Sequence, residues 1–379
     1  MKNDFPLDRA GLHERYRSGA LTPRRMLEHL LERMEADTHP NIWISNPDPG
    51  WLLEQADRLA ETDLSEKPLY GLPFAIKDNI DLAGLPTTAG CPDYAYQPDR
   101  SAFVVERLMA AGALPIGKTN LDQFATGLVG IRSPYGLCGN AFNPAYIPGG
   151  SSSGSAVAVA RGLATFSLGT DTAGSGRIPA AFNNLLGLKP TRGAVSNSGV
   201  VPACRSLDCV SIFCLTAADG QAILNVAADY DPEDPYARRV QHGPPLPPSF
   251  RFGVLPDAEC ETFGDDDCRT LYRAAIEHMK DLGGHPVEID FEPFRLAARL
   301  LYEGPWVTER FVAIERFLTE QPDSVYPVTR KIIEGGRQPS AADAFKAAYE
   351  LQALRRRSEA TWDEVLFVMT PTAGTIYTI

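Results

Sequence analysis

The sequence predicts an α/β fold. Short apolar segments that read as buried strands alternate with segments of helical period, and the alternation continues to residue 290. Hydrophobic residues make up 44% and charged residues 22% of the chain, which is typical of a globular protein. Its 379 residues are enough for one large domain or two ordinary ones.

The first 65 residues predict helices. Residues 7–35 contain two, and the second begins at Thr22 as N-cap with Pro23 in the first helical position. A further helix is expected over residues 51–62. No chemical motif occurs here, so we expect residues 1–65 to be a helical region that packs on a core formed by residues 66–379.

The elements of that core are predicted from apolar runs and helical periodicity. In order they are strand 74–76, helix 102–111, strand 113–117, a short helix or turn at 120–127, helix 156–162, strand 165–169, strand 252–255, helix 264–282, strand 287–290, and long helices at 293–318 and 340–361. Residues 365–379 read as a buried strand, a turn and the start of something more, so we expect the fold to be incomplete at its C-terminus.

The net charge and the cysteines limit the binding partners, cofactors and cellular location that we expect for this protein. The net charge is −12, which argues against a general affinity for nucleic acid or for an anionic membrane. The seven cysteines are odd in number and lack metal-ligand spacing, so we expect reduced thiols, a cytoplasmic protein and no metal or other cofactor. The N-terminus lacks the apolar run of a signal peptide, and no stretch of 18 apolar residues predicts a membrane span.

The stretch from residue 148 to residue 179 carries the strongest chemical signal. It begins and ends in Gly/Ser-rich runs, and its middle is rich in Ala and Val. A flexible linker would be polar throughout, so both ends are expected to be folded turns in which backbone N–H groups converge. Such turns suit an oxyanion or a phosphate, and we interpret Ser175 as a nucleophile held in one of them.

A serine nucleophile needs a base, and histidine has poor support. None of the six histidines lies in a Gly/Ser turn, and G-x-S-x-G does not occur around Ser175. The remaining candidate is a lysine with a second serine as relay. Lys77 follows the apolar residues 74–76, and on these residues alone it either extends to solvent or is buried and neutral as a base.

Residues 112–119 match the G-x-x-x-x-G-K-[ST] phosphate-loop pattern. A phosphate loop follows a strand and opens a long helix, whereas here a helix precedes the match and the loop would be the apolar Leu-Pro-Ile. We therefore expect no nucleotide site, although Lys118 can still line a site.

The sequence resembles the amidase signature family, most strongly over residues 69–216. The resemblance rests on three segments: GLPFAIKDN at 71–79, GGSS at 149–152, and DTAGSGRIP at 171–179. It implies that Ser175 is the nucleophile, that Ser151 is the relay serine on a cis peptide bond, and that Lys77 is the base. It also implies a mixed central sheet covered on both faces by helices, and a smaller C-terminal domain that is absent from this chain.

The same resemblance implies how an oxyanion is stabilised. The donors would be the backbone N–H groups of Thr172, Ala173, Gly174 and Ser175, each worth about 3 kcal/mol of barrier. Ser153 and Ala173 stand where many relatives have glycine, and both are small enough to leave the triad intact.

Within the family the sequence is most similar to the allophanate hydrolases, in segments 143–155, 172–177 and 206–213. The resemblance assigns Tyr302 and Arg310, within 302–310, to the substrate carboxylate, and places Gly127 in the substrate site. It implies a small anionic amide as substrate and a homodimer, with a larger assembly that degrades urea or cyanurate left open.

Two alternatives stay open within the same family. One is a hydrolase of another small amide, such as a biuret-type or malonamide-like molecule, and the other is a component of a glutamine-dependent tRNA amidotransferase.

Overall fold

The computed structural model describes residues 7–241 and 243–379. Two compact units divide the chain, and each is described by itself. The first comprises residues up to 240 together with 313–332 and 378–379, and the second comprises 241–312 and 333–377. The boundary expected at residue 65 falls inside the first unit and stays a prediction.

The first unit is built on a six-stranded mixed sheet with the order β1-β3-β2-β4-β6-β5. Strand β2 is parallel to β3 and β4, whereas β1, β6 and β5 run antiparallel to their neighbours. The strands are β1 (Trp43–Ser45), β2 (Pro73–Lys77), β3 (Leu114–Thr119), β4 (Phe166–Thr170), β5 (Leu186–Leu188) and β6 (Val210–Cys214). The predicted α/β fold with a mixed sheet is confirmed.

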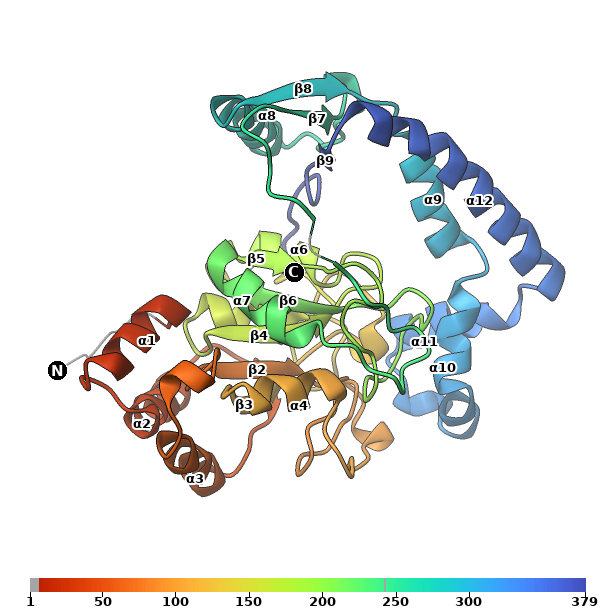
Figure 1. The fold of residues 1–379 in the computed structure, drawn as a ribbon. Coiled ribbons are helices and arrows are strands. Elements are labelled where there is room, and N and C mark those ends of the chain that lie inside the picture. The colour runs from red at the N-terminus through yellow and green to blue at the C-terminus, as the bar shows by residue number, and fades with distance from the viewer. Residues whose placement is uncertain (1–6, 242) are drawn as a thin grey trace. The chain divides into compact units, whose positions relative to one another are not determined.

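Helices α1 to α7 surround this sheet (Figure 1). Helix α5 packs against β2, β3, β4 and β6, and α7 packs against β5, β6 and α4. The helices are α1 (Arg9–Arg17), α2 (Pro23–Ala36), α3 (Pro49–Ala60), α4 (Phe103–Ala110), α5 (Ser153–Ala160), α6 (Arg177–Phe182) and α7 (Ala217–Ala227). The predicted start of α2 is confirmed, because the Thr22 hydroxyl accepts a hydrogen bond from the Arg25 amide at 3.2 Å.

Close packing within the sheet fixes β2 beside β4. The rings of Phe74 and Phe166 stack with centroids 5.1 Å apart, and the two residues are partners in the parallel register. All five residues of each strand are buried. A polar side chain at the end of either strand is therefore held rigidly and is largely shielded from solvent.

The second unit has a three-stranded parallel sheet with the order β8-β7-β9. Its strands are β7 (Phe250–Val254), β8 (Gly284–Glu288) and β9 (Phe367–Met369). Helix α8 (Asp266–Asp281) connects β7 to β8, and α9 (Glu292–Glu303) packs on α12 (Ala341–Glu364). Phe252 and Phe367 stack across the strand pair with centroids 5.9 Å apart, which builds the small core of this unit.

The predicted long helix at 293–318 is instead two helices. Helix α9 ends at Glu303, and α10 (Val307–Glu320) begins after Gly304 and Pro305. Pro305 lacks an N–H group and its ring crowds the preceding turn, which explains the interruption. Helix α11 (Pro327–Glu334) follows α10.

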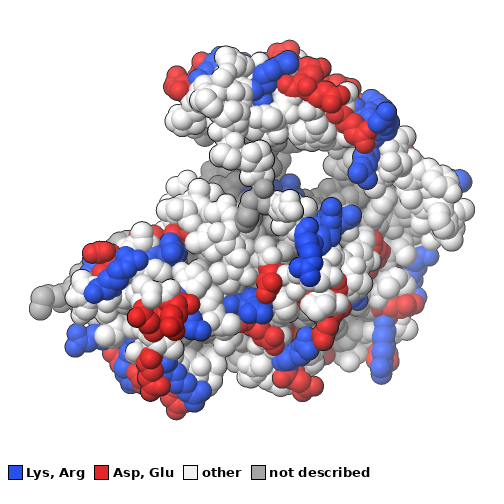
Figure 2. Space-filling view, in the orientation of Figure 1, with Lys and Arg blue, Asp and Glu red and all other residues white. Residues whose placement is uncertain are grey.

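Charged side chains of both signs are interspersed over the N-terminal helices (Figure 2). Arg24 pairs with Glu28 at 3.0 Å, and Arg58 pairs with Glu54 at 3.9 Å. Exposed pairs of this kind contribute little stability. Across the described residues, the structure has no helix with the length and apolar character needed to cross a membrane.

Candidate active site

Lys77 is the last residue of β2, and its side chain is 0% exposed. Its Nζ donates hydrogen bonds to Ser151 Oγ and to Thr170 Oγ1, both at 2.7 Å. Because β2 and β4 are parallel, their carboxyl ends meet at one edge of the sheet, and this places Lys77 beside Thr170. Of the two interpretations left open by the sequence, a lysine that extends to solvent is wrong.

Ser151 lies in the loop that leads into α5, and it is also fully buried. The Gly150–Ser151 peptide bond is cis, as the family resemblance implies. The Ser151 carbonyl accepts a hydrogen bond from the Asp122 amide at 3.0 Å. Next to it, the Ser152 hydroxyl donates to the Thr170 carbonyl at 3.2 Å, so the loop is tied to the end of β4.

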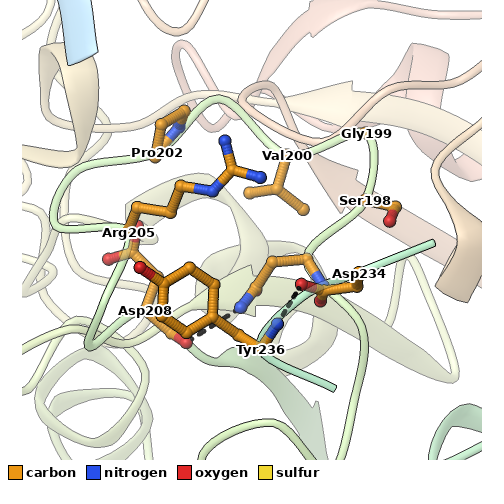
Figure 3. Close-up of a pocket in the computed structure, with 9 residues that line it drawn as sticks. Ser198, Gly199, Val200, Pro202, Arg205, Asp208, Asp234 and Tyr236 are labelled. Carbon is orange, nitrogen blue, oxygen red and sulfur yellow. Dashed lines mark hydrogen bonds between the residues drawn. The ribbon is translucent and has the colours of Figure 1, made fainter. Parts of the chain in front are cut away.

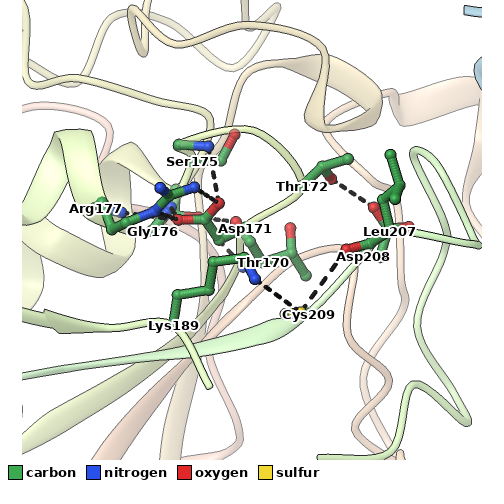
Figure 4. Close-up of polar contacts among 12 residues, drawn as sticks. Thr170, Asp171, Thr172, Ser175, Gly176, Arg177, Lys189, Leu207, Asp208 and Cys209 are labelled. Atoms are coloured by element: carbon green, nitrogen blue, oxygen red, sulfur yellow. Dashed lines mark hydrogen bonds and ion pairs between the residues drawn. The ribbon is translucent and has the colours of Figure 1, made fainter. Parts of the chain in front are cut away.

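The turn that carries Ser175 connects β4 to α6, and the buried carboxylate of Asp171 organises it (Figure 4). The carboxylate accepts hydrogen bonds from the amides of Gly174 at 2.8 Å and Gly176 at 3.1 Å. It also accepts two from the Arg177 guanidinium, at 2.8 and 2.9 Å. One side chain thus fixes the backbone on both sides of Ser175.

The charge on Asp171 has a consequence for acid stability. Burial alone would raise the pKa of Asp171, but the hydrogen bonds and charge of Arg177, together with two loop amides, hold this pKa below its ordinary value. A depressed folded-state pKa means that the interaction stabilises the protein above the unfolded aspartate pKa of about 4. That stabilisation is lost as the pH falls through the lower, folded-state pKa.

We therefore expect Asp171→Asn to lower the free energy of unfolding at neutral pH by on the order of 2 kcal/mol, because charged hydrogen bonds are lost. The free energy should also fall less steeply than in the wild type below about pH 4. Urea unfolding at a series of pH values measures both effects. Asp57→Asn is the control, since it removes only an exposed ion pair with Arg24. An unchanged acid profile for Asp171→Asn would contradict the assignment.

Ser175 is 4% exposed, and its Oγ donates a long hydrogen bond of 3.4 Å to the Gly127 carbonyl. The structure therefore brings Gly127 to the candidate nucleophile. Gly174, directly before Ser175, has φ +128°, which residues with a side chain rarely adopt. Within residues 7–241 and 243–379 no hydrogen bond joins Ser175 to Ser151, so the proton transfer between the two serines stays a prediction.

The backbone amides expected to form the oxyanion hole differ in their partners. The Gly174 amide already donates to Asp171. The amides of Thr172 and Ser175 donate to no acceptor in the described part of the chain, which leaves them able to bind an oxyanion. The Thr172 hydroxyl donates to Asp208, whose carboxylate also accepts the amides of residues 203 and 204.

Asp122 is a further residue of the site that the sequence did not single out. Its carboxylate accepts the amides of Gly130 at 3.0 Å and Arg132 at 2.9 Å. Burial raises the pKa of this carboxyl group, against the effect of those amides. A Cβ on Gly127 or on Gly150 would lie 2.5 or 2.2 Å from Asp122 Oδ2, so the carboxyl group packs directly against both of the loops that reach the candidate nucleophile and relay.

Lys118 does not belong to a phosphate loop. Residues 114–119 are the buried strand β3, and Lys118 Nζ pairs with Asp78 Oδ1 at 3.0 Å, with both side chains 0% exposed. The same Nζ donates to Thr87 Oγ1 at 3.0 Å. The structure thus places Lys118 in a buried ion pair within a strand.

Tyr302 and Arg310 lie in the second unit, Tyr302 near the end of α9 and Arg310 in α10. The catalytic candidates all lie in the first unit. The role of Tyr302 and Arg310 toward the substrate therefore stays a prediction from the resemblance.

Comparisons with known proteins show what the chain as a whole is similar to. The family model Amidase matches residues 25–377. The urea amidolyase of Saccharomyces cerevisiae is 46% identical over 352 residues, which cover 92% of this chain and 19% of that protein. The chain thus spans about a fifth of the length of the urea amidolyases it matches.

This chain covers a larger share of two further relatives. A crystal structure of Kluyveromyces lactis allophanate hydrolase superposes with a TM-score of 0.87 at 46% identity, over 92% of this chain and 58% of that one. A glutamyl-tRNA(Gln) amidotransferase component from a Cyanothece species is 32% identical, over 96% of this chain and 82% of that protein.

Proposed function

Because the chain belongs to the amidase family, we propose that it hydrolyses allophanate (urea-1-carboxylate) to ammonia and N-carboxycarbamate. Ser175 is the nucleophile, Ser151 relays the proton, and Lys77 is the terminal base. Similarity to allophanate hydrolase and to urea amidolyase supports the choice of substrate. The observation that carries the mechanism is the buried 2.7 Å hydrogen bond between Lys77 Nζ and Ser151 Oγ.

The reaction begins with proton transfer. Neutral Lys77 takes a proton from Ser151, which takes one from Ser175, and the Ser175 oxygen attacks the amide carbon. Backbone amides of the turn 172–175 stabilise the oxyanion that forms. The proton returns through Ser151 to the leaving nitrogen, and ammonia departs. Water then hydrolyses the acyl-enzyme, and the released N-carboxycarbamate loses carbon dioxide.

Specificity for an anion is assigned to Arg310, with Tyr302 as a second hydrogen-bond donor to the substrate carboxylate. We expect Arg310→Ala to raise KM for allophanate by about 10- to 100-fold, as the loss of a charge-assisted hydrogen bond predicts. Hydrolysis of malonamide, which carries no charge, should change little.

Steady-state ammonia release with both substrates measures this effect. Arg316→Ala is the matched control, because Arg316 lies on the same helix and its side chain is 90% exposed. Equal losses on allophanate and malonamide would argue against recognition of the carboxylate by Arg310.

A second candidate is a role in a tRNA amidotransferase complex, favoured by the similarity to the glutamyl-tRNA(Gln) amidotransferase component. An ammonia-release assay with allophanate, biuret, malonamide and glutamine side by side separates the candidates. Preferred turnover of allophanate by the purified protein supports our proposal, whereas activity on glutamine only after addition of partner proteins supports the second.

The proposed homodimer in the cytoplasm is tested by light scattering and by fractionation of cells.

A further inference from the structure

A pocket of about 170 Å³ opens in the first unit between the segment 197–208 and the turn at Asp234–Tyr236 (Figure 3). Its lining does not include Lys77, Ser151 or Ser175. A water molecule occupies about 30 Å³, so the pocket has room for several waters or for one small molecule.

Two polar groups of this pocket, the Arg205 guanidinium and Asn197 Oδ1, have no hydrogen-bond partner among the described residues. The guanidinium of Arg205, which extends toward Val200 in Figure 3, makes no hydrogen bond or ion pair with any residue in 7–241 or 243–379. Asn197 Nδ2 donates to the Asp208 carbonyl at 3.0 Å, but its Oδ1 is buried and accepts no hydrogen bond from the described residues. A buried acceptor without a donor is costly, so a ligand that supplies an N–H group would be favoured.

The charges around the pocket decide the class of ligand. Asp208 and Asp234 are both buried, and their carboxylates accept backbone amides, those of Asn197 and Tyr236 in the case of Asp234. With one arginine against two aspartates, the lining carries a net negative charge, which disfavours an anion. A molecule that presents a carbonyl to Arg205 and an N–H to Asn197, without net charge, satisfies both unpaired groups.

The pocket is connected to the candidate active site through Asp208. This residue lines the pocket and accepts a hydrogen bond from the hydroxyl of Thr172, whose amide is one of the expected oxyanion donors. We propose that the pocket is a second binding site for a small uncharged amide, and that its occupancy shifts the Thr172 end of the nucleophile turn through Asp208.

The site is tested with malonamide as the probe and with the Ser175→Ala protein, for which absence of ammonia release from malonamide is checked first so that binding is measured without turnover. We expect a crystal soaked with malonamide to show it between Arg205 and Asn197. When Arg205→Gln is added to the Ser175→Ala protein, titration calorimetry should show at least tenfold weaker binding of malonamide at this site. Adding Arg316→Gln instead should leave the affinity unchanged. Arg205 is exposed, so its replacement should leave folding intact.

Coupling has its own readout in the protein with Ser175 present. Malonamide should change the rate at which a serine-directed phosphonate labels Ser175. Arg205→Gln should remove the part of this rate change that follows occupancy of the second site. Malonamide seen only beside residue 175 in the soaked crystal, or bound equally well after Arg205→Gln, would overturn the second site. A labelling rate independent of Arg205 would overturn the coupling.

Discussion

Replacement of Ser175 by alanine is expected to reduce kcat for ammonia release by about 10⁴-fold or more, as in other enzymes that lose a nucleophilic serine. The reason is that the other hydroxyl of the turn between β4 and α6, that of Thr172, already donates a hydrogen bond to Asp208. The measurement is steady-state ammonia release at saturating allophanate, with circular dichroism to confirm that the variant is folded.

Ser358→Ala is the control for this prediction, since Ser358 lies on α12 in the second unit and its hydroxyl donates to the Arg355 carbonyl of the same helix. It should keep wild-type kcat. Substantial activity of Ser175→Ala on allophanate would rule out Ser175 as the nucleophile and with it the proposed relay.

Replacement of Lys77 by methionine is expected to lower kcat by about 10²- to 10⁴-fold, the range in which a positioned base contributes. Methionine keeps much of the buried volume, whereas Ser151 loses the group that accepts its proton. KM should change little, because Lys77 is buried behind the relay serine and has no predicted contact with the substrate. Separate measurement of kcat and KM tests this split.

Lys118→Met is the informative contrast, because it also removes a fully buried lysine. Its loss leaves Asp78 as an uncompensated buried charge, which costs about 3–5 kcal/mol of stability. We expect Lys118→Met to unfold at lower urea concentration, with activity per folded molecule reduced far less than in Lys77→Met. Wild-type kcat for Lys77→Met would show that another group acts as the base.

Much of this architecture could be predicted from local sequence. The apolar run before Lys77 and the run at 165–169 became the paired strands β2 and β4, and the small residues after Ser152 became α5. These segments are short and strongly patterned, so their local preferences agree with the fold. The position of Lys77 directly after the predicted strand 74–76 also made burial one of two possibilities for its side chain.

The rest depends on contacts between residues distant in the chain. Nothing in the local sequence shows that Thr170 would be the second acceptor for Lys77, 93 residues away, or that Asp122 would pack against two glycine loops. Nor could spacing show that Asp171 takes the Gly174 amide, which reduces the set of expected oxyanion donors. The antiparallel pairing of β1 with β3, and of β6 with β4, is likewise set by the sheet and not by the sequences of β1 and β6 themselves.

The central claim is that Ser175 forms a covalent bond with the substrate. The most direct measurement is reaction of the wild-type protein with a serine-directed phosphonate, followed by intact-mass analysis and peptide mapping. Our account predicts one adduct per chain, located on Ser175, with loss of ammonia release in proportion to labelling. Loss of activity with the adduct on any other residue would contradict it.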